Sequence, residues 1–266
     1  MQLRYITCSD PREFNDIHDI VKLGKLSPRV EIAVQAHPSK MSPGMPRNEW
    51  FRELLQYVMV DKHKIRLAVH VNREWCDQVC RTGTIPNELI EFFEMCRNGN
   101  VYDALIKRWQ FNMPADTAKN INIHALKKLM NLYPEKYFIF QYNNNTSDAI
   151  AKLFNANARF SVLHDASGGR GIAPNSWHAP LYSNVPQGYS GGMSPENVVA
   201  NLDKISDVAK RPVAQYKGND TIYKMEERSD IWIDAEGKLK TDDKFDVVRA
   251  RQYILNAENW LQQNQR

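Results

Sequence analysis

The sequence has few cysteines, with four among its 266 residues. Only Cys76 and Cys80 lie close together, and their i, i+4 spacing on an expected helix differs from the closer spacing of a zinc knuckle. No second cysteine pair accompanies them, so the sequence indicates neither a zinc module nor the disulfide framework of a small secreted domain. We expect reduced thiols and a cytoplasmic protein.

Long apolar runs and a strong net charge are absent as well. No run approaches the length of a membrane-spanning helix, and the first residues are too polar for a secretory signal peptide. The formal net charge of +4 is mild for this length and is not gathered as a nucleic-acid groove would require. We therefore expect neither a membrane nor a nucleic acid as partner, and the charge permits a small anionic substrate.

What the sequence does have is a repeated alternation of β-rich runs and helical patterns, with no low-complexity linker between the units. The β-rich runs lie at residues 3–8, 30–37, 65–72, 108–113, 137–143, 160–165, 187–193 and 230–237. Eight such units in a chain of this size predict one α/β domain spanning residues 1–266, a single (β/α)8 TIM barrel. A doubly wound open sheet is the alternative fold.

Polar residues close several of these runs, and barrel enzymes place their chemistry at that end of the strands. Asp165 ends the run FSVLHD and is followed by Gly168, Gly169 and Gly171. A carboxylate at the rim of a packed barrel is partly desolvated, which raises its pKa and suits it to act as an acid. The glycines permit backbone amides to approach a ligand closely. A plain loop cap is the alternative for such an aspartate.

A second glycine pair marks the seventh unit. In YSGGMSPEN, Gly191 and Gly192 end the strand, and Ser194 with Pro195 is suited to begin a helix. Free backbone amides and the helix dipole would point in the same direction there, which makes an anion-binding site. Because the loops after the seventh and eighth strands of TIM barrels commonly hold a phosphate, we expect a phosphate at these glycines.

Other polar residues near the strand ends allow more than one interpretation. Cys8 is either a small buried residue or, with a lowered pKa, a reactive thiol. Amides such as Gln110 are suited to recognise hydroxyl groups and equally suited to cap loops. His164 alternates with Asp165 along one strand, so we expect it to face the helices as a hydrogen-bonded packing residue.

A metal-dependent hydrolase is a third possibility, although no compact ligand motif supports a metal. Such a site would use His37, His70, Asp165 and Asp234.

Together these motifs resemble a known family, the phosphoribosylanthranilate isomerases of tryptophan biosynthesis, across the whole chain and in order. ITCS is similar to the family's first-strand motif and places Cys8 on its catalytic cysteine. LHDASGGRG is similar to the sixth-strand motif and places Asp165 on the catalytic aspartate. SGGMSPENV is close to the family's glycine-glycine motif, and WIDAEG matches Asp234 to the aspartate of the eighth strand.

Other positions depart from the family. Its fourth-strand motif is reduced to Gln110 in QFNM, and Lys40 is a substitute at best for the arginine expected after the second strand. Glu236 replaces a serine of the eighth strand, and alternation turns it to the same face as the aspartate of that strand. A glutamate there would repel a phosphate. The chain also has extra residues around 78–100 and 209–228.

The resemblance implies an aldose–ketose isomerase, an intramolecular oxidoreductase without cofactor or metal. In its Amadori rearrangement, an aminoaldose phosphate becomes an aminoketose through an acid that opens the sugar ring and a base that removes the C2 proton. By this resemblance Asp165 is the acid and Cys8, as a thiolate, the base. The expected substrate-binding residues are Asp234, Gly168, Gly169, Gly171, Gly191, Gly192, Gln110 and Lys40. The alternative is a relative without isomerase activity that binds or acts on another anionic small molecule.

Overall fold

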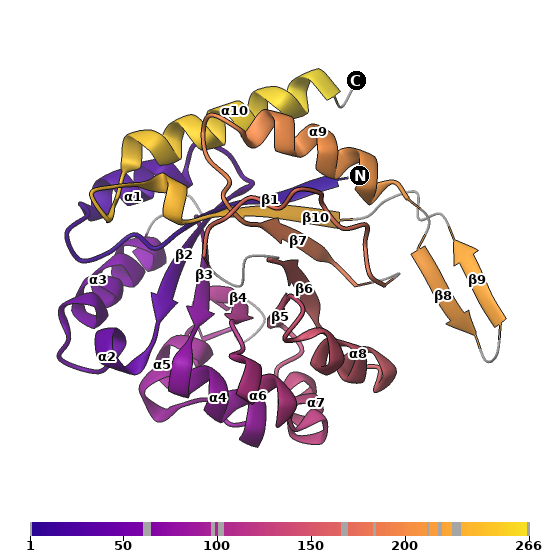
Figure 1. Cartoon of the computed structure of the whole chain (residues 1–266). Helices are drawn as coiled ribbons and strands as arrows, with labels where there is room; N and C mark the ends of the chain where they lie inside the picture. The colour runs from indigo at the N-terminus through magenta and orange to yellow at the C-terminus, as the bar shows by residue number, and fades with distance from the viewer. Residues whose placement is uncertain are drawn as a thin grey trace.

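The computed structural model describes most of the chain (Figure 1). The described residues are 2–60, 65–96, 99–100, 104–165, 170–182, 185–211, 213–217, 220–224 and 230–264, with the backbone alone described for 213–217 and 220–224. Two predicted binding residues, Gly168 and Gly169, therefore lie outside the described residues.

Eight parallel strands close into a barrel, which confirms the predicted (β/α)8 TIM-barrel class. Their order around the barrel is β1-β10-β7-β6-β5-β4-β3-β2. The strands are β1 (Gln2–Ser9), β2 (Val30–Ala36), β3 (Arg66–Val71), β4 (Ile106–Phe111), β5 (Tyr137–Tyr142), β6 (Ser161–His164), β7 (Gln187–Ser190) and β10 (Asp230–Ala235). Each of the eight predicted runs contains one of these strands or overlaps it.

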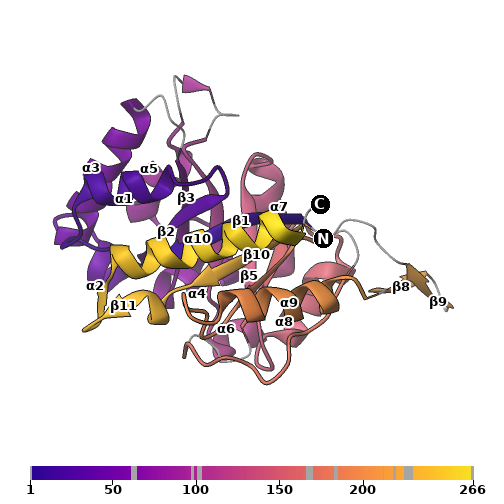
Figure 2. The same ribbon diagram turned by 90° about the horizontal axis from the view of Figure 1, so that it is seen from above.

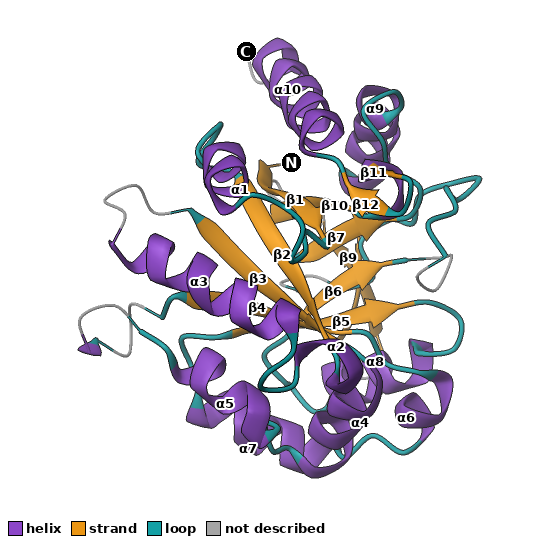
Figure 3. Cartoon of the chain, turned by 90° about the vertical axis from the view of Figure 1, so that its left-hand side faces the viewer, coloured by secondary structure: helices purple, strands orange, loops and turns teal. Residues whose placement is uncertain are grey.

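Helices surround the strands on the outside of the barrel, as Figure 3 shows. They are α1 (Ile17–Gly24), α2 (Pro38–Met41), α3 (Pro46–Val60), α4 (Arg73–Thr82), α5 (Asn87–Glu94), α6 (Ala115–Lys119), α7 (Ile123–Leu132), α8 (Ser147–Asn155), α9 (Val198–Ala209) and α10 (Val247–Asn264). The C-terminal helix α10 packs against α1, α9 and β1, so the last element of the chain covers the first strand (Figure 1).

Alternation along the strands separates the two sides of the barrel wall. In β4, Trp109 contacts Phe93 of α5, and Phe111 stacks on Phe138 of the neighbouring strand. Gln110, between these two aromatic residues, faces the interior instead. Apolar side chains thus hold the helices to the outer wall, while polar side chains collect inside the barrel.

Side chains fill the middle of the barrel interior. A small apolar group occupies it, consisting of Ile139, Leu163 and Trp232 with Tyr5 packed against them. A Cβ on Gly188 would lie 2.0 Å from the Trp232 ring, so only glycine leaves room for this indole. Glu31 and Arg108 form a buried ion pair with 2.9 Å between Oε2 and Nε. This layer separates a cavity of about 460 Å³ at the amino-terminal end, which Tyr5, Arg108 and Trp232 line, from the cavity at the carboxyl-terminal end.

The sixth unit departs from the regular pattern, because residues 170–182 of its connection form a loop and not a helix. Aromatic side chains of this loop cover the outer wall. Trp177 packs edge-on against Tyr189 of β7, and Tyr182 stacks on Phe154 of α8.

His164 also faces this outer side, as predicted. It is buried and stacked on Tyr189, and its Nε2 lies 2.6 Å from Oε1 of Gln187. The expectation of a hydrogen-bonded packing residue is confirmed.

The two segments that lengthen the chain differ from each other. The segment 78–100 contains the end of α4 and all of α5. The segment 209–228 contains an antiparallel hairpin of β8 (Val213–Lys217) and β9 (Asp220–Lys224), which projects away from the barrel in Figures 1 and 2. A second small hairpin, β11 (Lys240–Thr241) and β12 (Lys244–Phe245), leads into α10.

Candidate active site

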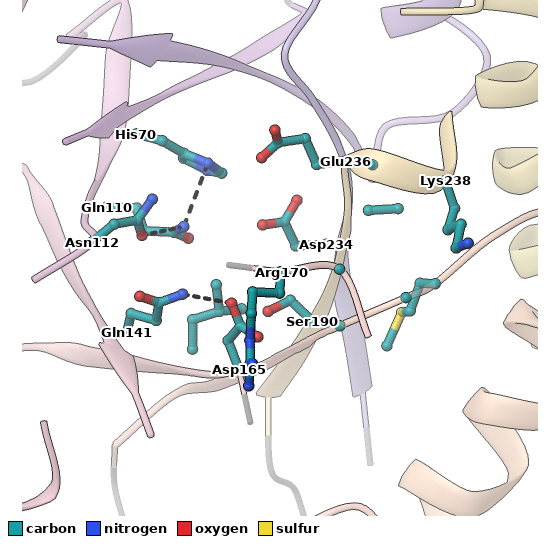
Figure 4. A pocket seen from close by; sticks show the side chains of 17 residues that line it. His70, Gln110, Asn112, Gln141, Asp165, Arg170, Ser190, Asp234, Glu236 and Lys238 are labelled. Atoms are coloured by element: carbon teal, nitrogen blue, oxygen red, sulfur yellow. Dashed lines mark hydrogen bonds between the residues drawn. The ribbon is translucent and has the colours of Figure 1, made fainter. Parts of the chain in front are cut away.

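A cavity of about 130 Å³ lies at the carboxyl-terminal end of the barrel, where the sequence predicted the site (Figure 4). The predicted residues that line it are Gln110, Asp165, Gly171, Gly191, Gly192 and Asp234. Further lining residues include His70, Asn112, Gln141, Ser190 and Glu236. The polar side chains come from strands on opposite sides of the barrel, so the fold brings together residues that are far apart in the sequence.

Asp234, on β10, is 7% exposed. The hydroxyl of Ser9 donates a hydrogen bond of 2.6 Å to its Oδ1. Burial raises the pKa of Asp234 to about 7, and the charge of Asp165 acts in the same direction, while the Ser9 hydrogen bond and Arg108 oppose the shift. A carboxyl group that titrates near pH 7 can both give and take a proton under neutral conditions.

Asp165 follows directly after β6 and is 5% exposed. Its backbone nitrogen donates to the carbonyl oxygen of Tyr142 on β5, which fixes the start of the loop. Gln141 donates from Nε2 to Oδ2 of Asp165 over 2.5 Å. Asp165 and Asp234 therefore form a pair of buried carboxyl groups in one cavity, each held by a neutral hydrogen-bond donor.

Cys8 is not part of this cavity. Its neighbours Thr7 and Ser9 donate hydrogen bonds to Glu31 and Asp234 inside the barrel, so alternation turns Cys8 outward. The thiol is fully buried in the core, and burial followed by the charge of Asp234 raises its pKa well above the usual value. The predicted thiolate base does not fit this position, because a reactive thiolate needs a lowered pKa and contact with the substrate.

Gly191 and Gly192 permit a close contact between two loops. They have φ angles of +118° and +60°, which favour glycine. A Cβ on Gly192 would lie 2.5 Å from the backbone nitrogen of Ala173, and one on Gly191 would lie 2.9 Å from the carbonyl oxygen of Ile172. The pair thus lets the loop after β6 pack against the loop after β7.

The helix that follows these glycines begins later than predicted, at Val198 and not near Ser194. Asn197 accepts a hydrogen bond from the Ser194 amide and donates one to the carbonyl oxygen of Gly192, each over 2.9 Å. One amide expected to bind an anion is therefore bonded within the chain. Phosphate binding at the glycines stays a prediction.

Sequence reasoning missed several polar residues of the site, among them Ser9 and Gln35, which contact Asp234 and Glu236. A signal for Gln35 was present in VEIAVQA, because the acid Glu31 in an otherwise apolar strand has to face a polar interior. That fixes the alternation of β2 and places Gln35 inside the barrel.

Glu236 lies on the same side as Asp234, as the sequence predicted. Figure 4 shows the two carboxylates pointing from β10 toward His70 and Gln110. Gln35 donates from Nε2 to Oε2 of Glu236 over 2.8 Å, and Lys240 pairs with Oε1 at 3.1 Å.

A second cavity of about 470 Å³ adjoins the first, and Asn112, Gln141 and Glu236 line both. Cationic side chains gather in its wall, namely Arg12, Lys40, Arg47 and Arg73. The predicted binding residue Lys40 therefore lies beside the first cavity and not in it. Burial, followed by the charges of Arg73, Arg47 and Lys40, lowers the pKa of His37, which also lines this cavity.

Asp10 holds several of these cations in place. Arg12, Arg47 and Lys240 each form an ion pair with its carboxylate. Burial opposes the ionisation of Asp10, yet the hydrogen bonds and charges of Arg12 and Lys240 lower its pKa. The buried Asp10 thus anchors Arg12 and Arg47 of this wall, whereas Lys40 and Arg73 are exposed.

Among the residues that the structure describes, no group of three or more His, Cys, Asp or Glu side chains is arranged to hold a metal ion. His70 lines the first cavity and His37 the second, so the four residues of the hydrolase alternative are not brought together. None of the helices in the described ranges is both long and apolar enough to cross a membrane.

The fold and the site define a TIM barrel with a buried pair of aspartates in a cavity at the carboxyl ends of its strands. No protein-family model matches the sequence, and no curated protein matches it. Among solved structures, the fold is similar to N-(5′-phosphoribosyl)anthranilate isomerase from Pyrococcus furiosus, with 11% identity, a TM-score of 0.48, and coverage of 96% of this chain and 98% of that chain. That protein is of the family whose motifs the sequence resembles.

Proposed function

We propose that this protein is an acid–base isomerase that converts an aminoaldose phosphate into an aminoketose, as the resemblance of its motifs implies. The observation that supports this most is the pair of buried carboxyl groups, Asp165 and Asp234, that line one cavity. Such an isomerisation needs one group that gives a proton and one that takes a proton in the same site. Two carboxyl groups with different environments can divide these roles between them.

In this proposal Asp234 is the acid and Asp165 the base. Asp234 protonates the ring oxygen, the bond from C1 to that oxygen breaks, and the nitrogen lone pair forms a C1–nitrogen double bond. Asp165 then takes the C2 proton, which gives an enaminol. Return of this proton to C1 and loss of the O2 hydroxyl proton to Asp234 give the aminoketose and restore both groups. The pKa of Asp234 near 7 suits a group that gives and regains a proton.

The adjoining cavity is our proposed site for the anionic end of the substrate. Guanidinium and ammonium groups recognise phosphate and carboxylate oxygens, and Lys40, Arg47 and Arg73 line this cavity next to Gln141. The glycine pair Gly191 and Gly192 is the competing location. Lys40→Gln should weaken phosphate binding if the anion lies in the cationic cavity and leave it unchanged if the anion lies at the glycines. Glu236→Ser removes a carboxylate that lines both cavities, so it should tighten binding at either location.

Direct turnover of phosphoribosylanthranilate tests the proposal. Asp165→Asn should lower turnover by about 10² to 10⁴-fold, as expected for loss of a general base. Asp230→Asn is the matched control, because Asp230 lies at the other end of the barrel and pairs with Arg4 on the surface. Normal turnover in Asp165→Asn would place the base elsewhere, and a wild-type protein without turnover would refute the isomerase.

The second candidate function is a protein that binds, or acts on, another anionic small molecule. The outward position of Cys8 and the carboxylate of Glu236 in the cavity favour it, because both differ from what the resemblance implies for the isomerase. Calorimetric binding of a sugar phosphate without isomerase turnover would support this candidate. A role in tryptophan biosynthesis and a cytoplasmic location are part of the first proposal, the isomerase, and do not follow from the second.

A further inference from the structure

His70 stands on β3 in the wall of the cavity and has no role in the steps above. It is 3% exposed, and two amide side chains approach its Nδ1. Gln35 Nε2 and Gln110 Nε2 each lie 3.4 Å from this atom. Whether Nδ1 carries a proton depends on which way these two amides are turned.

The orientation of Gln35 follows from two groups that can only accept hydrogen bonds. The backbone carbonyl oxygen of His70 lies 2.8 Å from Nδ2 of Asn72, which identifies that atom as the nitrogen. The same nitrogen donates to Oε1 of Gln35 over 2.6 Å. Gln35 therefore presents its own nitrogen to the Glu236 carboxylate, at 2.8 Å, and to His70.

The orientation of Gln110 follows from the same chain of amides. Oδ1 of Asn72 accepts from Nδ2 of Asn112 over 2.9 Å, and Oδ1 of Asn112 accepts from Nε2 of Gln110 over 3.0 Å. Figure 4 shows Gln110 between Asn112 and His70. Two N–H groups thus face Nδ1, so Nδ1 accepts hydrogen bonds and the proton of the neutral ring is on Nε2.

We propose that His70 is a neutral hydrogen-bond donor, which offers its Nε2–H to a carbonyl or hydroxyl oxygen of the substrate. This deepens the proposed function and rests on it, since the oxygen is that of the sugar that isomerises. No residue in the described ranges accepts a hydrogen bond from Nε2, and Asp234 and Glu236 face His70 across the cavity. A fixed donor there can stabilise charge that develops on a substrate oxygen next to the acid–base pair.

The charges around His70 are compatible with this role. Burial lowers the pKa of His70 to about 4, and Arg108 acts in the same direction. Glu236, Glu31 and Asp10 oppose that shift without overcoming it. The ring is therefore neutral near physiological pH, and the amides of Gln35 and Gln110 favour its proton on Nε2.

Nitrogen NMR of the intact protein tests the tautomer without any need for turnover. Long-range proton–nitrogen spectra should show His70 as the Nε2–H tautomer, with no titration above about pH 5. In the double variant Gln35→Leu/Gln110→Leu, the Nδ1–H tautomer should become populated, while His164 serves as an internal control that does not change. An Nδ1–H tautomer in the wild type, or protonation of the ring near pH 6.5, would overturn the inference.

Ligand binding tests the donor itself, with ribose 5-phosphate as the probe. His70→Leu removes the donor, and affinity should fall about three- to tenfold, whereas His70→Gln keeps an N–H group and should stay within about twofold. Unchanged affinity in His70→Leu, or an equal loss in both variants, would overturn the donor role. The expected tautomer and affinities in a protein without isomerase turnover would refute the proposed function and leave the inference about His70 in place.

Discussion

The barrel buries charged groups at two levels, one within its interior and one in the cavity at its carboxyl-terminal end, and the two levels differ in how these charges are paired. In the lower level, the charges of Glu31 and Arg108 pair with 2.9 Å between Oε2 and Nε, and Thr7 donates a hydrogen bond to Glu31. In the upper level, Asp165 and Asp234 are similarly buried, and the charge of one raises the pKa of the other. In the lower pair, opposite charges attract each other. In the upper pair, two carboxyl groups of like charge are buried in one cavity, so ionising both lowers the stability of the folded protein. Such a cost is expected where a site is built for proton transfer and not for folding.

The largest expected effect comes from removing the ionisable group of the upper level. Asp234→Asn should lower isomerase turnover by about 10² to 10⁴-fold and at the same time stabilise the protein at pH 8. Above pH 7 the native state has to bury the charge of Asp234, and an amide removes that cost, which is on the order of a few kcal/mol. Chemical denaturation of both proteins at pH 8 measures the gain.

Asp230→Asn is the control for this stability gain, because Asp230 lies on the same strand but pairs with Arg4 at the exposed end. It should change the free energy of unfolding by less than about 1 kcal/mol. A destabilised Asp234→Asn would show that the Asp234 carboxylate contributes to folding, and the contrast between the two levels would fail.

Breaking the lower pair should have the opposite effect on stability. Arg108→Met leaves Glu31 buried without its partner and should destabilise the protein by about 3 to 5 kcal/mol. Because Arg108 lowers the pKa of Asp234, the variant should also shift any pH–rate profile that depends on Asp234 to higher pH. Adding Glu31→Leu to this variant should restore most of the stability, since no unpaired charge then remains. A double variant as unstable as the single one would contradict the interpretation.

Lowering the pH should change the contributions of the buried histidines and of Asp234 to the free energy of unfolding in opposite directions. Burial lowers the pKa of His70 and of His164 to about 4, so between pH 6.5 and 4 the unfolded state takes up their protons first and stability falls as the pH falls. Each contributes on the order of 3 kcal/mol. Asp234 has a raised pKa, so its term has the opposite sign, because the native state binds the proton first. Unfolding of Asp234→Asn measured across this window should therefore show a steeper loss than the wild type, and parallel curves would contradict the assignment.

The sequence was sufficient for the barrel because its eight strands carry a local signal. Each is a short apolar run, and the alternation of strand and helix permits few arrangements. The sequence also located Asp165 and Asp234, since a carboxylate at the end of an apolar strand has little reason to be there except for polar contacts. The loop 170–182 was less predictable, because its aromatic residues cover the outer wall without any helical pattern.

The geometry inside the cavity could not be derived in the same way. Whether Cys8 or Ser9 faces inward depends on the register of β1 within the closed barrel, and both are small residues that either face would accept. The tautomer of His70 depends on a chain of amides on β2 and β4 and directly after β3 and β4, and no local pattern encodes such a chain. The resemblance to a family implied that Cys8 is the thiolate base. Because Thr7 and Ser9 face the interior, Cys8 faces outward and does not fit that role.

The smallest expected effect is that of Cys8→Ala, which compares the two faces of one strand. Cys8 packs in the core, so the variant should lose about 1 kcal/mol of stability through the missing sulfur and keep its turnover and sugar-phosphate affinity within about twofold. Ser9→Ala is the partner variant: it removes the hydrogen bond that opposes the raised pKa of Asp234, so the pH–rate profile should shift upward while the core is unchanged. Steady-state kinetics over pH on both variants distinguish the faces. A folded Cys8→Ala protein without turnover would mean that the thiol reaches the substrate after all, and the assignment of acid and base to Asp234 and Asp165 would then have to be given up.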